Sequence, residues 1–130
     1  WLKPMAQAAM RILKRLDGRL ERRKGGEAVA SGLTYVDTSG HTPGHMSIMA
    51  ESGGARLMIG GDMLTHIAVS FARPEWRIGS DYDRDRAVTA RKSMLDWLAT
   101  DRIPLVGFHL PWPGHGMVER HGAAFRFVPL

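Results

Sequence analysis

Two stretches of the chain repeat apolar residues at the three- and four-residue spacing of an α-helix. The first covers residues 5–24, with basic residues mostly on the opposite side, and Gly25-Gly26 is expected to end it. The second covers residues 83–100, where either Asp83 or Asp81 can serve as the N-cap. The side chains expected to face the core from the second helix are Ala87, Val88, Met94, Leu95 and Leu98.

Short apolar runs bounded by glycine, proline and polar residues predict strands in the rest of the chain. These runs are residues 33–36, 46–50, 56–59, 104–108, 117–120 and 124–128. Glycine-containing turns at 52–54 and 121–122 join two of the pairs as hairpins. Residues 63–71 are expected to form a loop or an irregular strand. Strands interleaved with two helices indicate an α/β fold.

The net charge of +5 belongs to the first helix alone. Residues 1–30 hold eight Lys and Arg against three acidic residues, whereas residues 31–130 hold ten of each. The two interpretations are a solvated helix face and a membrane-surface or nucleic-acid role. The segment has no aromatic residue for base stacking apart from Trp1, so neither a nucleic acid nor a membrane is expected as a partner.

The 130 residues contain no cysteine, which excludes disulfides, thiolate zinc sites and a cysteine nucleophile. Histidine and carboxylate remain as the strong metal ligands. No apolar run approaches the roughly 20 residues of a membrane span, and no signal peptide is evident at the start. A soluble protein is expected, in the cytoplasm, the periplasm or outside the cell.

Three polar residues stand where predicted strands end: His41, Asp62 and His109. Taken singly, each also fits a turn or a structural histidine. Together, two imidazoles and one carboxylate are the donors that a divalent metal site without sulfur requires. Pro43 and Gly44 separate His41 from His45, which forbids the helical pairing of two zinc ligands, so only one of the two histidines needs to bind a metal.

The ordered motifs resemble the C-terminal half of a metallo-β-lactamase-fold hydrolase. They are Gly-His-Thr-Pro-Gly-His at 40–45, Gly-Gly-Asp at 60–62 and Gly-Phe-His at 107–109. Further similarity to the methyl parathion hydrolase and lactonase-like branch lies in residues 62–74, 109–114 and 125–129. The resemblance implies half of an αββα sandwich, with a mixed sheet and flanking helices. It covers nearly everything after Gly32.

The resemblance also implies a role for each matching residue. His41 would bind one metal ion, His109 would bind a second, and Asp62 would bridge both and act as the catalytic carboxylate. Zinc is the expected metal, as two ions, although other divalent metals suit the same ligands. The residues expected to shape or brace the loop around this site are Thr42, Pro43, Gly44 and His45. Candidate substrate-pocket residues are Met63, Thr65, His66, Phe71, Trp76 and Trp112.

One part of the family pattern is missing from this chain. Such enzymes carry a His-x-His-x-Asp-His motif in their N-terminal half, whereas no histidine precedes His41 here, and the sequence begins with Trp1 rather than Met. Residues 1–130 are therefore expected to be the C-terminal portion of one longer domain.

The implied function is hydrolysis of esters, lactones or phosphotriesters by a metal-bound hydroxide, with the isolated chain inactive. The alternative is a non-catalytic remnant or interaction domain that retains half of the fold. Half of a sandwich would expose an apolar face, which favours a homodimer.

Overall fold

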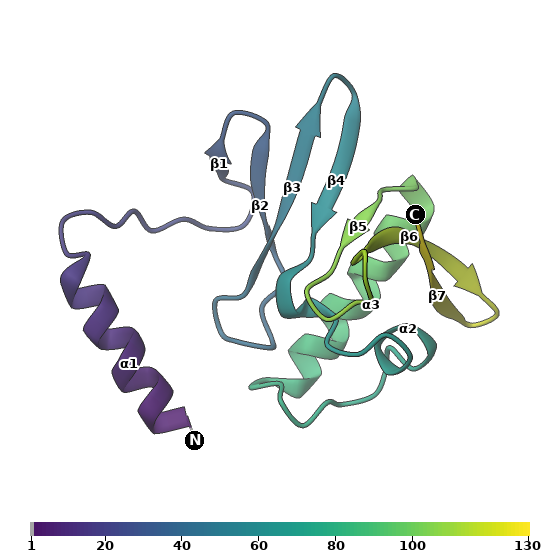
Figure 1. The fold of residues 1–130 in the computed structure, drawn as a ribbon. Coiled ribbons are helices and arrows are strands. Elements are labelled where there is room, and N and C mark those ends of the chain that lie inside the picture. Colours follow the sequence, from purple (N-terminus) through teal and green to yellow (C-terminus); the bar gives the residue numbers. More distant parts are fainter. Residues whose placement is uncertain (1) are drawn as a thin grey trace.

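The computed structural model describes residues 2–130, and Trp1 lies outside this range. Within it the chain forms one seven-stranded sheet, whose strands lie side by side in sequence order (Figure 1). The strands are β1 (Ala28–Ala30), β2 (Leu33–Asp37), β3 (Met46–Ser52), β4 (Ala55–Ile59), β5 (Leu105–Val106), β6 (His115–His121) and β7 (Ala124–Pro129). The helices are α1 (Leu2–Arg15), the 3₁₀ turn η1 (Gly61–Met63), α2 (Val69–Ala72) and α3 (Arg84–Asp101). The predicted mixed sheet with flanking helices is confirmed.

Neighbouring strands are antiparallel except for β4 and β5, which are parallel. A parallel pair needs a crossover, which here contains η1, α2 and α3. Both predicted hairpins are present, because Gly53 and Gly54 adopt positive φ between β3 and β4, and Gly122 does so between β6 and β7. Since β2 and β3 are also antiparallel, the strands β2, β4 and β5 all run in the same direction, and the loops that follow them leave the same edge of the sheet.

The core lies between one face of the sheet and the helices α2 and α3. Strand pairing places Met49, Met58 and Leu105 in one row across β3, β4 and β5, and all three are buried. Helix α3 packs Leu95 and Leu98 onto this face, and both side chains are fully buried. This packing fixes the ends of β4 and β5, from which the site loops begin.

The opposite face of the sheet is also apolar. Pairing aligns Tyr35, Ile48, Ile59 and Val106 across four strands, and Ile59 is 40% exposed. In the described part of the chain both α2 and α3 lie on the other side, so this face has no helix packed on it. An uncovered apolar face is what half of a two-sheet sandwich presents.

Helix α3 matches its prediction closely. The Asp83 side chain caps it by accepting a hydrogen bond from the Arg86 amide at 3.0 Å, and the helix ends at Arg102 in the left-handed conformation. The predicted buried residues Ala87, Met94, Leu95 and Leu98 are buried, and Val88 is partly exposed.

Helix α1 is shorter than predicted and stands apart from the sheet (Figure 1). It ends at Arg15 rather than near residue 24, because the turn that follows contains Gly18 at a φ of 72°. Its apolar side chains are exposed, among them Met5, Ile12 and Leu13. No helix of residues 2–130 combines the length and apolar character needed to cross a membrane.

Three other predictions were wrong in detail. The strand predicted at 104–108 is only Leu105–Val106, because the Gly107 carbonyl accepts a hydrogen bond from the Leu110 amide and closes a turn, in which Phe108 is 81% exposed. Part of the segment 63–71, predicted as a loop or an irregular strand, belongs to the short helix α2. The strand β1 was not predicted, since three exposed residues carry no alternating pattern.

Candidate functional site

Three of the predicted site residues lie on loops that leave the same edge of the sheet. His41 lies between β2 and β3, Asp62 lies in η1 directly after β4, and His109 follows β5. Because β2, β4 and β5 run in one direction, their carboxyl ends bring these loops together although the residues are far apart in sequence. The strands thus position side chains on the loops that follow them, a common arrangement for binding sites.

The carboxylate of Asp62 lies between the two histidines. Its Oδ1 accepts a hydrogen bond from Nε2 of His109 at 3.0 Å, and its Oδ2 lies 3.8 Å from Nε2 of His41. The Asp62 and His109 side chains are 42% and 43% exposed, and that of His41 is 20% exposed. The site is therefore open on one side, and each carboxylate oxygen faces a different imidazole.

The donor set suits a borderline divalent metal such as zinc. Two imidazole nitrogens face opposite oxygens of a carboxylate, as a bridging ligand between two ions requires. Within residues 2–130, however, no cluster of three or more His, Cys, Asp or Glu side chains could hold one ion by itself. The residues fit a metal centre that needs further ligands.

His45 does not face the same carboxylate but ties the loops together. Its Nε2 accepts a hydrogen bond from the main-chain amide of Asp62 at 3.0 Å. Its Nδ1 lies 2.7 Å from the hydroxyl of Thr38, which is 3.0 Å from the hydroxyl of Ser47. The Ser47 hydroxyl donates to the carbonyl of Gly60 at 3.0 Å. This series of bonds links the end of β2, the start of β3 and the end of β4.

The direction of each bond in this series follows from its two ends. Because Nε2 of His45 accepts from an amide, the proton of the neutral ring is on Nδ1, which donates to Thr38. The Thr38 hydroxyl then donates to Ser47. Burial lowers the pKa of His45 below its usual value, His41 lowers it further, and the charge of Asp62 opposes this. The neutral ring that the network requires is therefore the favoured form.

Gly61 allows the His45 ring to approach η1. Its φ is 58°, and a Cβ placed there would lie 2.9 Å from Nε2 of His45. Any side chain at this position would therefore occupy the space of the ring. Position 61 therefore requires glycine for a reason other than ending the strand.

The residues between the two histidines form an exposed turn: Thr42, Pro43 and Gly44. The carbonyl of Thr42 accepts hydrogen bonds from the amides of Gly40 and His45, which closes the turn. Gly40 lies under α3, since a Cβ at this position would be 2.4 Å from the Ala87 amide nitrogen. The loop is thus held at both ends by its own backbone and by the helix.

The predicted pocket residues differ in burial. Met63 and Phe71 are 5% and 2% exposed and belong to the core, where Phe71 packs against the Phe127 ring. His66 accepts hydrogen bonds at Nδ1 from the amides of Ala68 and Val69 at the start of α2. The exposed fractions of Trp76 and Trp112 are 54% and 94%. Thr65 is partly buried.

Two residues next to the site were not predicted to belong to it. Asp81 accepts a hydrogen bond from Nδ1 of His41 at 3.0 Å, and its other oxygen accepts from Arg91 at 3.0 Å. Asp81 was considered only as a helix cap. One signal could have revealed Arg91: it lies four residues from both Ala87 and Leu95, on the apolar side of the predicted helix, where an arginine needs a buried partner.

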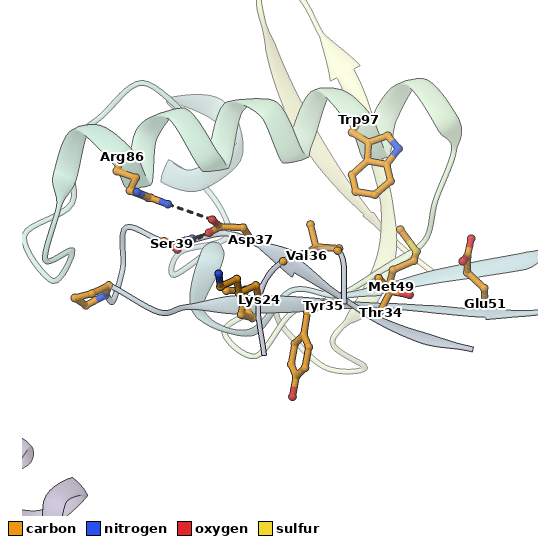
Figure 2. A pocket seen from close by; sticks show the side chains of 14 residues that line it. Lys24, Thr34, Tyr35, Val36, Asp37, Ser39, Met49, Glu51, Arg86 and Trp97 are labelled. Atoms are coloured by element: carbon orange, nitrogen blue, oxygen red, sulfur yellow. Dashed lines mark hydrogen bonds and ion pairs between the residues drawn. The ribbon is translucent and has the colours of Figure 1, made fainter. Parts of the chain in front are cut away.

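A cavity of about 730 Å³ lies beside the site loop, between α3 and the strands β2 and β3. Figure 2 shows Arg86 and Trp97 on α3 above Val36 and Met49 on the strands. At one end of the cavity, Arg86 forms an ion pair with Asp37 at 3.1 Å. Hydrogen bonds from the hydroxyl and amide of Ser39, and then the charge of Arg86, lower the pKa of Asp37. Asp37 thus helps to anchor the start of the loop that carries His41.

Substitution of Gly61 by alanine tests the close approach of His45. Gly61→Ala should cost more stability than Gly122→Ala, which has a similar φ of 61° and no atom within 4 Å of its added Cβ. Both variants carry the left-handed penalty of about 1–2 kcal/mol. Only Gly61→Ala should also lose the His45 hydrogen bond, adding about 1–3 kcal/mol. Urea unfolding measures the difference, and equal losses would contradict the packing.

Substitution of Asp37 tests the anchor of the loop. Its folded pKa lies below the ordinary value of 3.8, so the ionised group stabilises the fold above that value, and the effect is lost as pH falls through the lowered pKa. Asp37→Asn should therefore be less stable than wild type near neutral pH, with a difference that shrinks in acid. Urea titrations across this pH range measure it. The exposed Glu75→Gln serves as the control, and an Asp37→Asn difference independent of pH would contradict the account.

Comparison with known proteins identifies the fold. No protein-family model and no curated protein sequence matches the chain. Among solved structures, the dizinc quorum-quenching lactonase AidC is 30% identical, with a TM-score of 0.88 over 95% of this chain and 42% of AidC. The hydrolase AbOPH of the β-lactamase superfamily is 29% identical, with a TM-score of 0.81 over 89% of this chain and 40% of AbOPH.

A more distant structure shares the fold alone. The probable metal-dependent hydrolase from Staphylococcus aureus is 17% identical, with a TM-score of 0.63 over 87% of this chain and 41% of that protein. The chain thus spans about two-fifths of the length of each of these proteins. With its mixed sheet, with α2 and α3 on one face, and with these structural neighbours, the chain has about half of the αββα metallo-β-lactamase fold, and its neighbours are hydrolases of that superfamily.

Proposed function

We propose that the chain is the C-terminal portion of a metal-dependent hydrolase acting on esters, lactones or phosphotriesters. His41 and His109 would each bind one divalent metal ion, zinc in this proposal, and Asp62 would be shared between the two. The observation that carries the proposal is the placement of two imidazole Nε2 atoms against opposite oxygens of one carboxylate. The similarity to a dizinc lactonase and to the hydrolase AbOPH supports the reaction class.

The chain's own residues bind and orient the reacting groups. The Nε2 atom of His109 now donates to Asp62, and deprotonation of that nitrogen frees the same position for a metal. His45 holds the Asp62 backbone, so that the carboxylate keeps its position between the histidines. When bound, divalent metal supplies Lewis acidity, which activates water at neutral pH and polarises a carbonyl or phosphoryl oxygen.

The ligand count implies that another segment completes the site. With Asp62 shared, each ion receives one imidazole and one carboxylate oxygen, whereas catalytic zinc sites take three protein ligands. The uncovered apolar face of the sheet would pack against the second sheet of the sandwich, which carries the remaining ligands in this proposal. A homodimer formed through the same face would cover the apolar surface without supplying a His-x-His-x-Asp-His motif.

The ligand count predicts weak zinc binding by residues 1–130 alone, with at most one ion per chain and negligible ester hydrolysis. Isothermal titration calorimetry measures the stoichiometry. His41→Ala and His109→Ala should remove the residual binding, and the exposed His121→Ala should not. Two tightly bound zinc ions per chain would contradict the incomplete site, and unchanged binding by His41→Ala would contradict its position.

The coding sequence upstream of Trp1 tests the enzymatic assignment. The proposal expects a His-x-His-x-Asp-His motif there, and zinc-dependent hydrolysis of a panel of lactones, aryl esters and phosphotriesters by the longer protein. Asp62→Asn in that protein should abolish turnover. A start codon at or near Trp1, with no such motif, would favour the non-catalytic remnant or interaction domain instead.

A further inference from the structure

A buried ion pair lies directly behind His41. Asp81 and Arg91 have side chains that are 2% and 1% exposed, and they form an ion pair at 3.0 Å. Asp81 belongs to the loop before α3, whereas Arg91 lies in the second turn of that helix and beyond its N-cap. The free oxygen of Asp81 accepts a hydrogen bond from Nδ1 of His41 at 3.0 Å. Arg91, Asp81 and His41 are thus joined by hydrogen bonds that lead from the core to the candidate metal site.

The hydrogen bond between Asp81 and His41 determines which nitrogen of His41 carries the proton. A carboxylate paired with a guanidinium only accepts hydrogen bonds, so the Nδ1 of His41 must donate. In a neutral ring the Nε2 atom then has a free lone pair. The 3.8 Å from Nε2 to Asp62 is too long for a hydrogen bond, so this contact does not require a second proton on the ring.

We propose that Asp81, held in place by Arg91, is a positioning residue that fixes His41 as an Nε2 metal ligand. This inference rests on the proposed function in one respect, since it assigns the use of the lone pair to a metal. The hydrogen bond that sets the tautomer exists without it. A ligating histidine whose other nitrogen donates to a carboxylate is better oriented and more basic.

Backbone contacts hold the Asp81 loop against the His41 loop. The amide of Tyr82 donates to the carbonyl of His41 at 3.2 Å, and the amide of Asp83 donates to the carbonyl of Gly40 at 2.9 Å. The position of Asp81 relative to His41 is thus fixed by main chain as well as by side chain. Rotation of the imidazole is the freedom that remains, and the carboxylate restricts it.

Arg91 in turn holds the other end of the same loop. Its Nη1 donates to the carbonyls of Pro74 and Trp76 at 3.1 and 2.9 Å, while its Nη2 donates to Asp81. Burial lowers the pKa of Arg91, and the charge of Asp81 opposes this. These bonds satisfy Nη1 and Nη2, whereas the buried Nε has no partner, so removing Asp81 alone would leave a charged guanidinium even less compensated.

The test compares a double variant with a surface control. Asp81→Leu/Arg91→Met removes both charges together with the acceptor of the His41 hydrogen bond, and it avoids the unpaired arginine that the single Asp81→Leu change leaves. Asp85→Asn removes the exposed Arg77–Asp85 ion pair near the start of α3 and serves as the matched control. Long-range ¹H–¹⁵N NMR of the metal-free protein at mildly alkaline pH reports the His41 tautomer, and calorimetry with zinc alone reports affinity.

The inference predicts that His41 is protonated at Nδ1 in wild type and in Asp85→Asn. In the double variant that tautomer should no longer dominate, and zinc affinity should fall about 10- to 100-fold while circular dichroism shows a retained fold. An Nε2-protonated His41 in wild type, or a folded double variant with unchanged tautomer, would overturn it.

If the double variant does not fold, Arg91→Lys is the second variant to measure, because lysine can keep a cation beside Asp81. It should retain the Nδ1 tautomer, and loss of that tautomer in a folded Arg91→Lys protein would likewise overturn the inference. The two proposals fail separately: zinc binding that His41→Ala leaves unchanged contradicts the proposed function, whereas the tautomer measurement alone decides whether Asp81 positions His41.

Discussion

The hydrogen bond from the Asp62 amide to Nε2 of His45 is the contact on which the candidate site depends. It joins the loop after β2 to the turn after β4, and the bonds through Thr38 and Ser47 extend it to the carbonyl of Gly60. Each bond in the series has one possible direction. The site loops are therefore joined by a neutral histidine whose two ring nitrogens are both hydrogen-bonded, and the close approach of its ring restricts position 61 to glycine.

Strand direction explains why such distant residues meet. The core packs one face of β3, β4 and β5 against α3, which holds the carboxyl ends of the strands in register. Helix α3 contacts the loop that carries His41. Its Ala87 packs against Gly40, and its Arg91 donates to Asp81, the carboxylate that accepts a hydrogen bond from His41. The sheet thus positions Asp62 and His109, and the helix positions His41.

The sequence was informative where local chemistry decides structure. The two glycine turns, the Asp83 cap and the apolar side of α3 all follow from short-range patterns, and the ordered motifs indicated the fold. The same motifs pointed to His41, Asp62 and His109, whose side chains lie together in the structure. Contacts between residues far apart in the sequence leave no such short-range pattern, so they could not be predicted. The pairing of Asp81 with His41 spans 40 residues, and the burial of Phe71 in the core depends on packing against Phe127 of β7. The early end of α1 depends on the turn at Gly18, not on periodicity.

The central claim is that His41, Asp62 and His109 form a metal centre. An anomalous difference map from crystals of the 130-residue protein soaked in zinc tests it most directly. The account predicts the strongest zinc peak beside Asp62, in contact with Nε2 of His41 or His109, with the Nδ1 bond of His41 to Asp81 and both His45 bonds unchanged. Zinc found instead at His66, His115 or His121, with none beside Asp62, would contradict it.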